Sequence, residues 1–502
     1  MAEQPKRTSS LAGLGLRASG GREAVIGDIA VDSRTVMPGT LFAALPGSVV
    51  HGATFVEKAI ANGAVAVLTD AEGAQIAKAA IDAAGVAVIV AQDPRQTLAQ
   101  TASLWFGAHP ATVVAVTGTN GKTSVSTFCR QIWEAIGLKS VNLGTTGIEG
   151  GWNYPLAHTT PEPVTLHRAL AEATREGVSH CAMEASSHGL DQRRLDGVLL
   201  SAAGFSNFTQ DHLDYHKTFE AYFEAKMGLF TRVLAEDGVA VVNLDDPRGN
   251  EVASLCTARG QEVIGVGRHE DASLQVVGQR FDALGQDLLF RWQGKKYQAR
   301  LNLIGGFQAE NVMLAAGLCI GAGAAASDVI ESLPTLTTVR GRMELAATRE
   351  NGATVFVDYA HTPDAIATAL RAMRPHVMGR IVVVVGAGGD RDTTKRPLMG
   401  AAAAEHADVV IVTDDNPRSE DPASIRAAVM AGALNGIGTP SVTEVGDRAE
   451  AILRGVDALG AGDALLIAGK GHESGQTVGD TILPFDDVEQ ASVAVAALEG
   501  RI

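Results

Sequence analysis

The sequence predicts an α/β protein of three domains, and three observations support this fold class. The chain has 502 residues, more than one hydrophobic core usually organises at roughly 150 residues per domain. Apolar residues make up 46% and charged residues 20% of it, values typical of folded globular proteins. Short apolar runs alternate with helix-like stretches, and 56 glycines suit the many tight turns between strands and helices.

Residues 1–110 form the first expected domain. Apolar runs such as Ala64–Leu68 and Val86–Val90 alternate with helix-like stretches, which indicates a small α/β domain. Pro110 is a plausible boundary to the next domain.

Residues 111–338 form the second and largest expected domain. It opens with a strand at Thr112–Val116, and later strands are expected at His180–Met183 and Val198–Phe205. Strands that alternate with loops and helices predict a mostly parallel sheet covered by helices.

Residues 339–502 form the third expected domain, a Rossmann-like open parallel sheet. Each of its strand-like runs ends in a loop rich in Gly, Asp, Asn or His, and ligands bind such sheets outside the carboxyl ends of the strands. The segment Gly386–Arg391 lacks the third spaced glycine of a dinucleotide site, so an oxidoreductase is a weak alternative. The expected strands are Ala353–Val357, Ile381–Val385, Val409–Thr413 and Ala464–Ala468.

Charge and cysteine content exclude several classes of protein. A net charge of −16 disfavours unspecific binding to nucleic acid or anionic lipid, so we expect neither as a partner. The N-terminal segment lacks the apolar core of a signal peptide, and no apolar run approaches about 18 residues. We expect a cytoplasmic monomer without membrane insertion. The cysteines form no CxxC pair, which favours buried free thiols in a reducing compartment; they are Cys129, Cys181, Cys256 and Cys319.

A glycine-rich loop follows the Thr112–Val116 strand and precedes a helix-like run. Glycines let backbone N–H groups surround phosphate oxygens, Lys122 can reach the β- and γ-phosphates, and the Thr123 hydroxyl can bind Mg²⁺. The strict GxxxxGK[ST] pattern needs glycine where Val116 stands, so a chance turn is the alternative to an ATP site. The ATP-binding residues predicted in this loop are Gly118, Thr119, Asn120, Gly121, Lys122, Thr123 and Ser124.

Two later strands of the second domain lead into candidate metal ligands. Glu184 follows the first strand, and Asp211–His216 follows the second. If the strands are parallel, both ends face the phosphate loop, and Glu184 with Thr123 suits Mg²⁺, which prefers hard oxygen ligands. His212 is a less obvious Mg²⁺ ligand, and spacing alone favours Asp211–His216 as a helix start with polar caps.

Lys226 falls on the apolar stripe of the next expected helix, with Phe219, Tyr222, Phe223 and Phe230. The side chain can bend to the surface and keep its ammonium in water. Alternatively, burial favours the neutral amine, which can react with CO₂ to form a carbamate. A carbamate would turn this cation into a bridging oxygen ligand for Mg²⁺.

A series of motifs along the chain resembles the Mur ligases. In order they are TGTNGKT, HTTPEP, MEASSHGLDQRR, NFTQDHLDYH, EAKMGLF, GGFQAEN, GRME, DYAHTPDA, GDRD, DNPRSEDP and GKGHE. The motifs from the phosphate loop to GRME mark a superfamily that includes folylpolyglutamate synthetases. The motifs DNPR, HTTPEP and SSHGL resemble those of the family members that add diaminopimelate.

The resemblance implies roles for particular residues. The central domain would bind ATP, the N-terminal domain the UDP end of the second substrate, and the C-terminal domain the amino acid. Lys122, Glu184, His212 and Lys226 would be catalytic, and Thr123, Glu184, His212 and Lys226, as N6-carboxylysine, would hold two Mg²⁺ ions. Asn311, Arg342 and Asp358 would contact the nucleotide or help the last domain dock, with His361 nearby. The UDP-substrate contacts would be Val31, Ser33, Ser48, Val49, Val50, Thr159, Thr160, Ser186, Gln192 and Arg194.

The resemblance also implies that the amino acid is meso-diaminopimelate, which carries a carboxylate at its distal end where lysine has none. Arg418 offers a planar fork for that carboxylate, Arg391 a second cation, and Glu473 a partner for an ammonium group. Without the resemblance, the sequence favours a solvated loop arginine at Arg418. The residues implied to bind diaminopimelate are Arg391, Asp415, Asn416, Pro417, Arg418, Gly469 and Glu473.

The expected function is therefore an ATP-dependent ligase of peptidoglycan biosynthesis. It would add meso-diaminopimelate to the D-glutamate γ-carboxylate of UDP-N-acetylmuramoyl-L-Ala-D-Glu through an acyl phosphate. Three alternatives are a lysine-adding sister ligase, a folylpolyglutamate synthetase, and a nucleotide-binding module without catalysis. Arg418 disfavours the first, Thr159 and Ser186 the second, and the set of catalytic residues the third.

Overall fold

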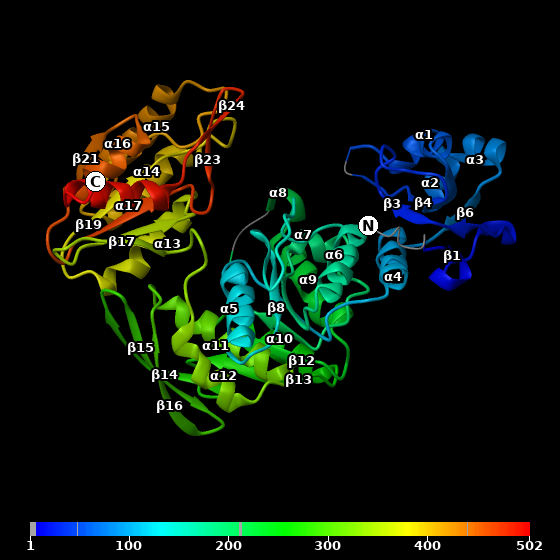
Figure 1. The fold of residues 1–502 in the computed structure, drawn as a ribbon, viewed down its shortest axis with the longest axis horizontal. Coiled ribbons are helices and arrows are strands. Elements are labelled where there is room, and N and C mark those ends of the chain that lie inside the picture. Colours follow the sequence, from blue (N-terminus) through cyan, green and yellow to red (C-terminus); the bar gives the residue numbers. More distant parts are fainter. Residues whose placement is uncertain (1–6, 48, 210–212, 439) are drawn as a thin grey trace. The chain divides into compact units, whose positions relative to one another are not determined.

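The computed structural model describes residues 7–47, 49–209, 213–438 and 440–502. The chain separates into two compact units. The first comprises residues 1–273 and 313–329, and the second comprises residues 274–312 and 330–502. Figure 1 traces the elements of both along the chain. The helices in the described part of the chain are all too short or too polar to cross a membrane.

The N-terminal part of the first unit is a parallel sheet in the order β3-β4-β5-β6, with helices on both faces. Successive residues of β4 face opposite sides, so Leu41 packs with α4 and Phe42 packs with α1. The strands are β3 (Asp28–Ala30), β4 (Thr40–Ala43), β5 (Ala64–Thr69) and β6 (Ala87–Val90), and β1 (Ser9–Ser10) pairs with β2 (Val25–Ile26). The helices are α1 (Val56–Ala61), α2 (Ala71–Ile76), α3 (Lys78–Ala84) and α4 (Pro94–Phe106).

The central part of the first unit is a sheet in the order β13-β12-β11-β7-β10-β8-β9, parallel except for β9. β7 lies between β10 and β11, so the carboxyl ends of these three strands lie side by side. The strands are β7 (Thr112–Thr117), β8 (Ser140–Gly144), β9 (Gly147–Gly150), β10 (His180–Glu184), β11 (Ala202–Phe205), β12 (Val239–Asn243) and β13 (Glu262–Gly267). The helices are α5 (Lys122–Ala135), α6 (Pro163–Arg175), α7 (Ser187–Asp191), α8 (Leu213–His216), α9 (Phe219–Gly228) and α10 (Gly249–Ala258).

The second unit contains a six-stranded sheet in the order β17-β18-β22-β19-β20-β21, parallel except for β17. It also contains an antiparallel meander, β14 (Leu274–Asp282), β15 (Gly285–Trp292) and β16 (Lys295–Leu301). The sheet strands are β17 (Glu344–Thr348), β18 (Thr354–Asp358), β19 (Ile381–Val385), β20 (Val409–Val412), β21 (Ser441–Glu444) and β22 (Ala464–Ala468). The hairpin β23 (Gly475–Val478) and β24 (Thr481–Pro484) stands apart as a two-stranded sheet.

Helices cover both faces of the six-stranded sheet, and β19 is buried along its whole length. Val383 packs in one apolar cluster and Val382 in the other, as expected of a strand covered on both sides. The helices of this unit are α13 (Pro363–Met373), α14 (Lys395–His406), α15 (Pro422–Asn435), α16 (Arg448–Asp457) and α17 (Asp487–Leu498). Two further helices are shared between the units: α11 (Phe307–Gly321) begins in the second unit, and α12 (Ala326–Ser332) ends in it.

The three-domain α/β fold class predicted from the sequence is confirmed, while the domain limits at 110 and 338 stay a prediction. Two details of the prediction are wrong. The strand expected at Val198–Phe205 begins only at Ala202, because a turn closes at Val198 and Leu199 is largely exposed. The antiparallel meander β14–β16 was not anticipated. The four cysteines are free and buried, as predicted.

Candidate functional site

The phosphate loop lies at the carboxyl end of β7, the position predicted for it. Lys122 begins α5, and its Nζ folds back to donate to the carbonyl oxygens of Gly118 at 2.9 Å and Thr119 at 2.8 Å. Gly121 caps the helix with a φ of 85°, a conformation that favours glycine. The loop therefore combines a positive helix N-terminus with a lysine amine, the usual features of a phosphate site.

The end of β11 holds this loop in shape through two residues that sequence reasoning did not single out as site residues. Ser206 Oγ donates to the Asn120 carbonyl at 2.6 Å, and Asn207 Oδ1 accepts from the Asn120 N–H at 2.8 Å. A Cβ at Gly118 would collide with Ser206 Oγ. Two features of the sequence pointed to Asn207, its position just after an expected strand and its place at the start of the NFTQDHLDYH motif.

Lys226 is buried beside the phosphate loop. Its side chain is 1% exposed, and its Nζ donates to the Gly118 carbonyl at 2.7 Å. The same Nζ lies 4.5 Å from the centre of the Tyr222 ring. The alternative that Lys226 bends to the surface is therefore wrong. On the same helix Tyr222 and Phe223 are buried, whereas Phe219 is 42% exposed and does not belong to the buried stripe.

Glu184 ends β10 beside Val116, which precedes the phosphate loop. Its carboxylate is buried and accepts from Thr145 at both oxygens, from N–H at 2.8 Å and from Oγ1 at 3.4 Å. Glu184 and Thr123 supply hard oxygen donors on neighbouring elements, which fits Mg²⁺. Within the described ranges no group of three or more His, Cys, Asp or Glu side chains could hold a metal. The predicted ligand His212 lies outside the described residues.

The predicted substrate residues of the central domain form one hydrogen-bond network with Glu184. Thr160 Oγ1 donates to the Glu184 carbonyl at 2.9 Å and accepts from the Ser186 N–H at 3.1 Å. Arg194 donates to the Thr160 carbonyl at 2.6 Å and to Gln192 Oε1 at 2.9 Å. Thr159 joins this network through Thr145, with 3.1 Å between their hydroxyls. The structure thus brings these five predicted residues together.

The predicted UDP contacts of the N-terminal domain are less closely grouped. Val31 lines a cavity of about 390 Å³ between β3 and α6, to which α6 contributes Arg168, a cation that sequence reasoning missed. Ser33 is buried, and its carbonyl accepts from Asn62 at 2.9 Å. Val49 and Val50 are exposed, and Ser48 lies outside the described residues.

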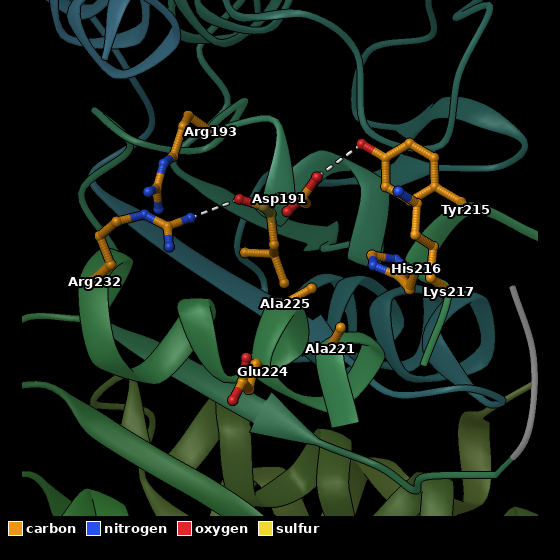
Figure 2. Close-up of a pocket in the computed structure, with 10 residues that line it drawn as sticks. Asp191, Arg193, Tyr215, His216, Lys217, Ala221, Glu224, Ala225 and Arg232 are labelled. Carbon is orange, nitrogen blue, oxygen red and sulfur yellow. Dashed lines mark hydrogen bonds between the residues drawn. The ribbon is translucent and has the colours of Figure 1, made fainter. Parts of the chain in front are cut away.

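A second cavity, of about 510 Å³, borders the substrate network (Figure 2). Its wall includes Tyr215, whose hydroxyl accepts from Gln192 Nε2 at 3.2 Å and donates to Asp191 at 2.7 Å. Burial raises the pKa of Tyr215. Arg193 also lines this cavity and pairs with Asp93 of the N-terminal domain at 2.9 Å. The cavity lies beside the substrate network. Its lining includes Tyr215 and His216 of the candidate segment Asp211–His216 but no residue predicted to bind a substrate.

The predicted nucleotide residues of the second unit centre on Asp358 at the end of β18. Its carboxylate accepts from the N–H groups of Met343 and Ala360, each at 2.8 Å. Burial raises the pKa of Asp358, and the nearby Arg342 opposes this shift. Arg342 lies 4.9 Å from the centre of the Tyr359 ring. His361 contacts the Tyr359 carbonyl at 2.8 Å, and Asn311 donates to Gln308 at 3.1 Å.

The residues predicted to bind the amino acid gather in three loops at the carboxyl ends of β19, β20 and β22. Arg418 Nη1 donates to the Gly389 carbonyl at 2.7 Å, which joins the first two loops. Arg418 has a φ of 51°, and the hairpin holds this backbone through Thr477 at 3.1 Å and Gly479 at 2.8 Å. Pro417 is buried beside it, and Arg391 is exposed.

The third loop meets the second through Asn416 and Glu473, with Asn416 Nδ2 donating to Glu473 Oε2 at 2.8 Å. Asp415 is buried, and a Cβ at Gly469 would collide with its carboxylate. Burial raises the pKa of Asp415, while Arg448 and Lys470 oppose this shift. The sequence does not single out Lys470 of the GKGHE motif, because a lysine between two glycines is typical of a solvated loop.

Three family models match successive parts of the chain. They are described as the Mur ligase family catalytic domain at residues 25–105, the Mur ligase middle domain at 116–319, and the Mur ligase glutamate ligase domain at 341–471. A UDP-N-acetylmuramoyl-L-alanyl-D-glutamate--2,6-diaminopimelate ligase from Bradyrhizobium diazoefficiens is 49% identical over 93% of this chain and 94% of its own length.

Solved structures that are similar to this chain also include ligases of this kind. A structure of a ligase with the same name is 33% identical, covers 98% of this chain and 100% of its own, and superposes with a TM-score of 0.73. A Mycobacterium tuberculosis folylpolyglutamate synthase is 20% identical over 81% of this chain and 95% of its own, with a TM-score of 0.59, and shares the fold alone. The chain belongs to the Mur ligase family.

Proposed function

We propose that this protein joins meso-diaminopimelate to the D-glutamate γ-carboxylate of UDP-N-acetylmuramoyl-L-Ala-D-Glu and consumes ATP in peptidoglycan biosynthesis. The names of the relatives at 49% and 33% identity support this substrate pair. The reaction uses ATP and a UDP-linked precursor, so we place it in the cytoplasm. We further expect that the protein acts as a monomer.

One observation carries the proposal, the physical connection between the phosphate loop and the substrate network. Glu184 lies on the strand next to β7, and its carbonyl is bound by Thr160. Thr160 in turn is bound by Arg194. Acyl phosphate chemistry needs the ATP γ-phosphate and an acceptor carboxylate in one place, and this network joins the two predicted binding regions.

In the first half-reaction a γ-carboxylate oxygen attacks the γ-phosphorus in line, which forms an acyl phosphate and releases ADP. Lys122 and the N–H groups at the start of α5 lie where they stabilise charge on the phosphate oxygens. Arg194 is a cation of the substrate network and is suited to orient the attacking carboxylate.

Thr123 and Glu184 would hold one Mg²⁺ ion, and His212 with a carbamate on Lys226 would hold a second. The ions would neutralise charge that develops on the phosphate oxygens. The carbamate forms when the neutral Lys226 amine bonds to CO₂ and loses a proton, which leaves a carboxylate. Burial of Lys226 next to the phosphate loop supports this modification, because it favours the neutral amine.

In the second half-reaction the diaminopimelate amine attacks the acyl carbon, and a tetrahedral intermediate collapses to the amide as phosphate leaves. Arg418 binds the distal carboxylate and Glu473 an ammonium group, with Arg391 as a further cation. L-Lysine lacks that carboxylate and would leave Arg418 without its ligand, a mismatch that gives rejection on the order of 10⁴-fold in comparable polar pockets.

The test is phosphate release from ATP and Mg²⁺ with the UDP-dipeptide substrate, comparing meso-diaminopimelate with L-lysine at equal concentration. We expect release with diaminopimelate and almost none with lysine. In Arg418→Ala, kcat/KM for diaminopimelate should fall about 100-fold or more while ATP affinity is kept, because a charged partner is lost. Equal release with lysine, or an unchanged kcat/KM in the variant, would remove Arg418 as the selector.

A further inference from the structure

Lys470 is a fully buried cation in the loop after β22. Its side chain has no exposed surface, and its ammonium donates to three acceptors. These are the Gly475 carbonyl at 2.6 Å, Glu473 Oε2 at 3.1 Å and Asn416 Oδ1 at 3.2 Å. An ammonium group has three donors, so these contacts satisfy it completely and fix its position.

These contacts determine the orientation of the Asn416 amide. Asn416 Oδ1 accepts from Lys470 and from the Thr477 N–H at 2.8 Å, while Nδ2 donates to Glu473 Oε2 at 2.8 Å. A flipped amide would place its NH₂ group against two donors and its oxygen against a carboxylate. Lys470 and the hairpin thus allow only one orientation of Asn416.

The same contacts leave Glu473 with one oxygen for a ligand. Oε2 accepts from both Lys470 and Asn416, whereas Oε1 accepts from none of the residues that the structure describes. The Glu473 side chain is 34% exposed, so it reaches solvent while one of its oxygens is held. This is the arrangement expected of a carboxylate that receives an ammonium group from a bound molecule.

We propose that Lys470 is a positioning residue that, directly and through Asn416, holds Glu473 so that its free oxygen binds an ammonium group of the amino-acid substrate. The role of Lys470 is indirect, because its three donors are used within the protein. This inference rests on the proposed function, which assigns diaminopimelate to the loops after β20 and β22. Loss of Lys470 should therefore weaken binding of the amino acid and leave binding of ATP and of the UDP-substrate unchanged.

The experiment is a double-mutant cycle of Lys470→Met and Glu473→Gln, with KM measured separately for each of the three substrates. We expect Lys470→Met to raise KM for diaminopimelate about 100-fold, with KM for ATP within about 2-fold. If Lys470 acts through Glu473, then Lys470→Met should have little further effect in the Glu473→Gln background. Arg454→Met, which removes an exposed cation paired with Glu450 on α16, is the control and should match the wild type.

The outcomes separate the two proposals. Effects that multiply in the double variant, or equal rises of KM for all three substrates, would show a merely structural role and overturn the positioning role. If Lys470→Met does not fold, Lys470→Gln keeps a donor without the charge, and the same cycle applies to it. A wild-type enzyme inactive with diaminopimelate would instead refute the proposed function, whatever the variants do.

Discussion

At the scale of single residues, buried polar groups show what tertiary contacts add to the sequence. Lys226 was marked by its place on an apolar helix stripe, and it is buried. Its partner, the Gly118 carbonyl, lies 108 positions away in the chain, so no local pattern reveals it. Lys470 gave no signal, because its contact with Asn416 depends on how the loops after β20 and β22 meet.

His167 on α6 makes a residue-scale prediction about stability. Burial, with a smaller effect of His109, lowers its pKa from 6.5 to about 4, and its Nε2 has no hydrogen-bond partner among the described residues. Between these values the unfolded chain binds a proton that the folded protein does not. The free energy of unfolding should therefore fall by about 3 kcal/mol as the pH drops through this window.

The measurement is urea unfolding of the wild type and His167→Leu at about pH 7 and about pH 4.5. Other titrating groups contribute equally to both proteins and cancel in the difference. We expect the variant to lose less stability than the wild type on acidification. Parallel losses in the two proteins would contradict the assignment.

At the scale of elements, strands buried on both faces were predicted best. Ile381–Val385 and Ala464–Ala468 match β19 and β22 residue for residue, because unbroken apolar runs mark strands that helices cover on both sides. The start of β11 was misplaced, since Val198–Leu200 is apolar but follows a turn and lies outside the strand. The meander β14–β16 was missed because its alternating polar and apolar residues give a weaker signal than the parallel strands around it.

The sequence identified the residues that form the loops of the candidate site, but it did not predict the backbone conformation of these loops. The Asp415–Arg418 segment was identified from its motif, whereas the hairpin β23–β24 that holds Arg418 at a φ of 51° was not. Hydrogen bonds between loops depend on the order of strands in the sheet, which neighbouring residues do not encode. The order β18-β22-β19-β20 places these loops side by side.

The phosphate loop makes an element-scale prediction. Gly118→Ala should lower ATP affinity about 10- to 100-fold, because its Cβ would push Ser206 away and shift the carbonyl that Lys122 and Lys226 share. Calorimetric titration with a non-hydrolysable ATP analogue measures the change. Gly137→Ala is the control, since Gly137 also has a positive φ, 83°, but has open space around it.

The control should cost about 1 kcal/mol of stability from backbone strain and leave nucleotide affinity intact. Equal affinities of Gly118→Ala and the wild type would mean that the loop does not bind phosphate in this conformation. A similar loss in both variants would assign the effect to general strain.

At the scale of the whole molecule, the predicted chemistry is divided between the two compact units. The phosphate loop and the Thr159–Arg194 network belong to the first unit. The loops after β19, β20 and β22, which hold the residues predicted to bind the amino acid, belong to the second. Each half-reaction of the proposed ligase therefore has its own set of residues. The acyl phosphate is the chemical species that links them, because it is the product of the first half and the substrate of the second.

The fate of one oxygen atom tests this account most directly. The UDP-dipeptide substrate is prepared with oxygen-18 in its D-glutamate γ-carboxylate, and the phosphate released during turnover with diaminopimelate is analysed by mass spectrometry. If the carboxylate attacks ATP, one labelled oxygen leaves with each phosphate and the other stays in the amide. Unlabelled phosphate would mean that the carboxylate never bonds to phosphorus, which would contradict the acyl phosphate ligase.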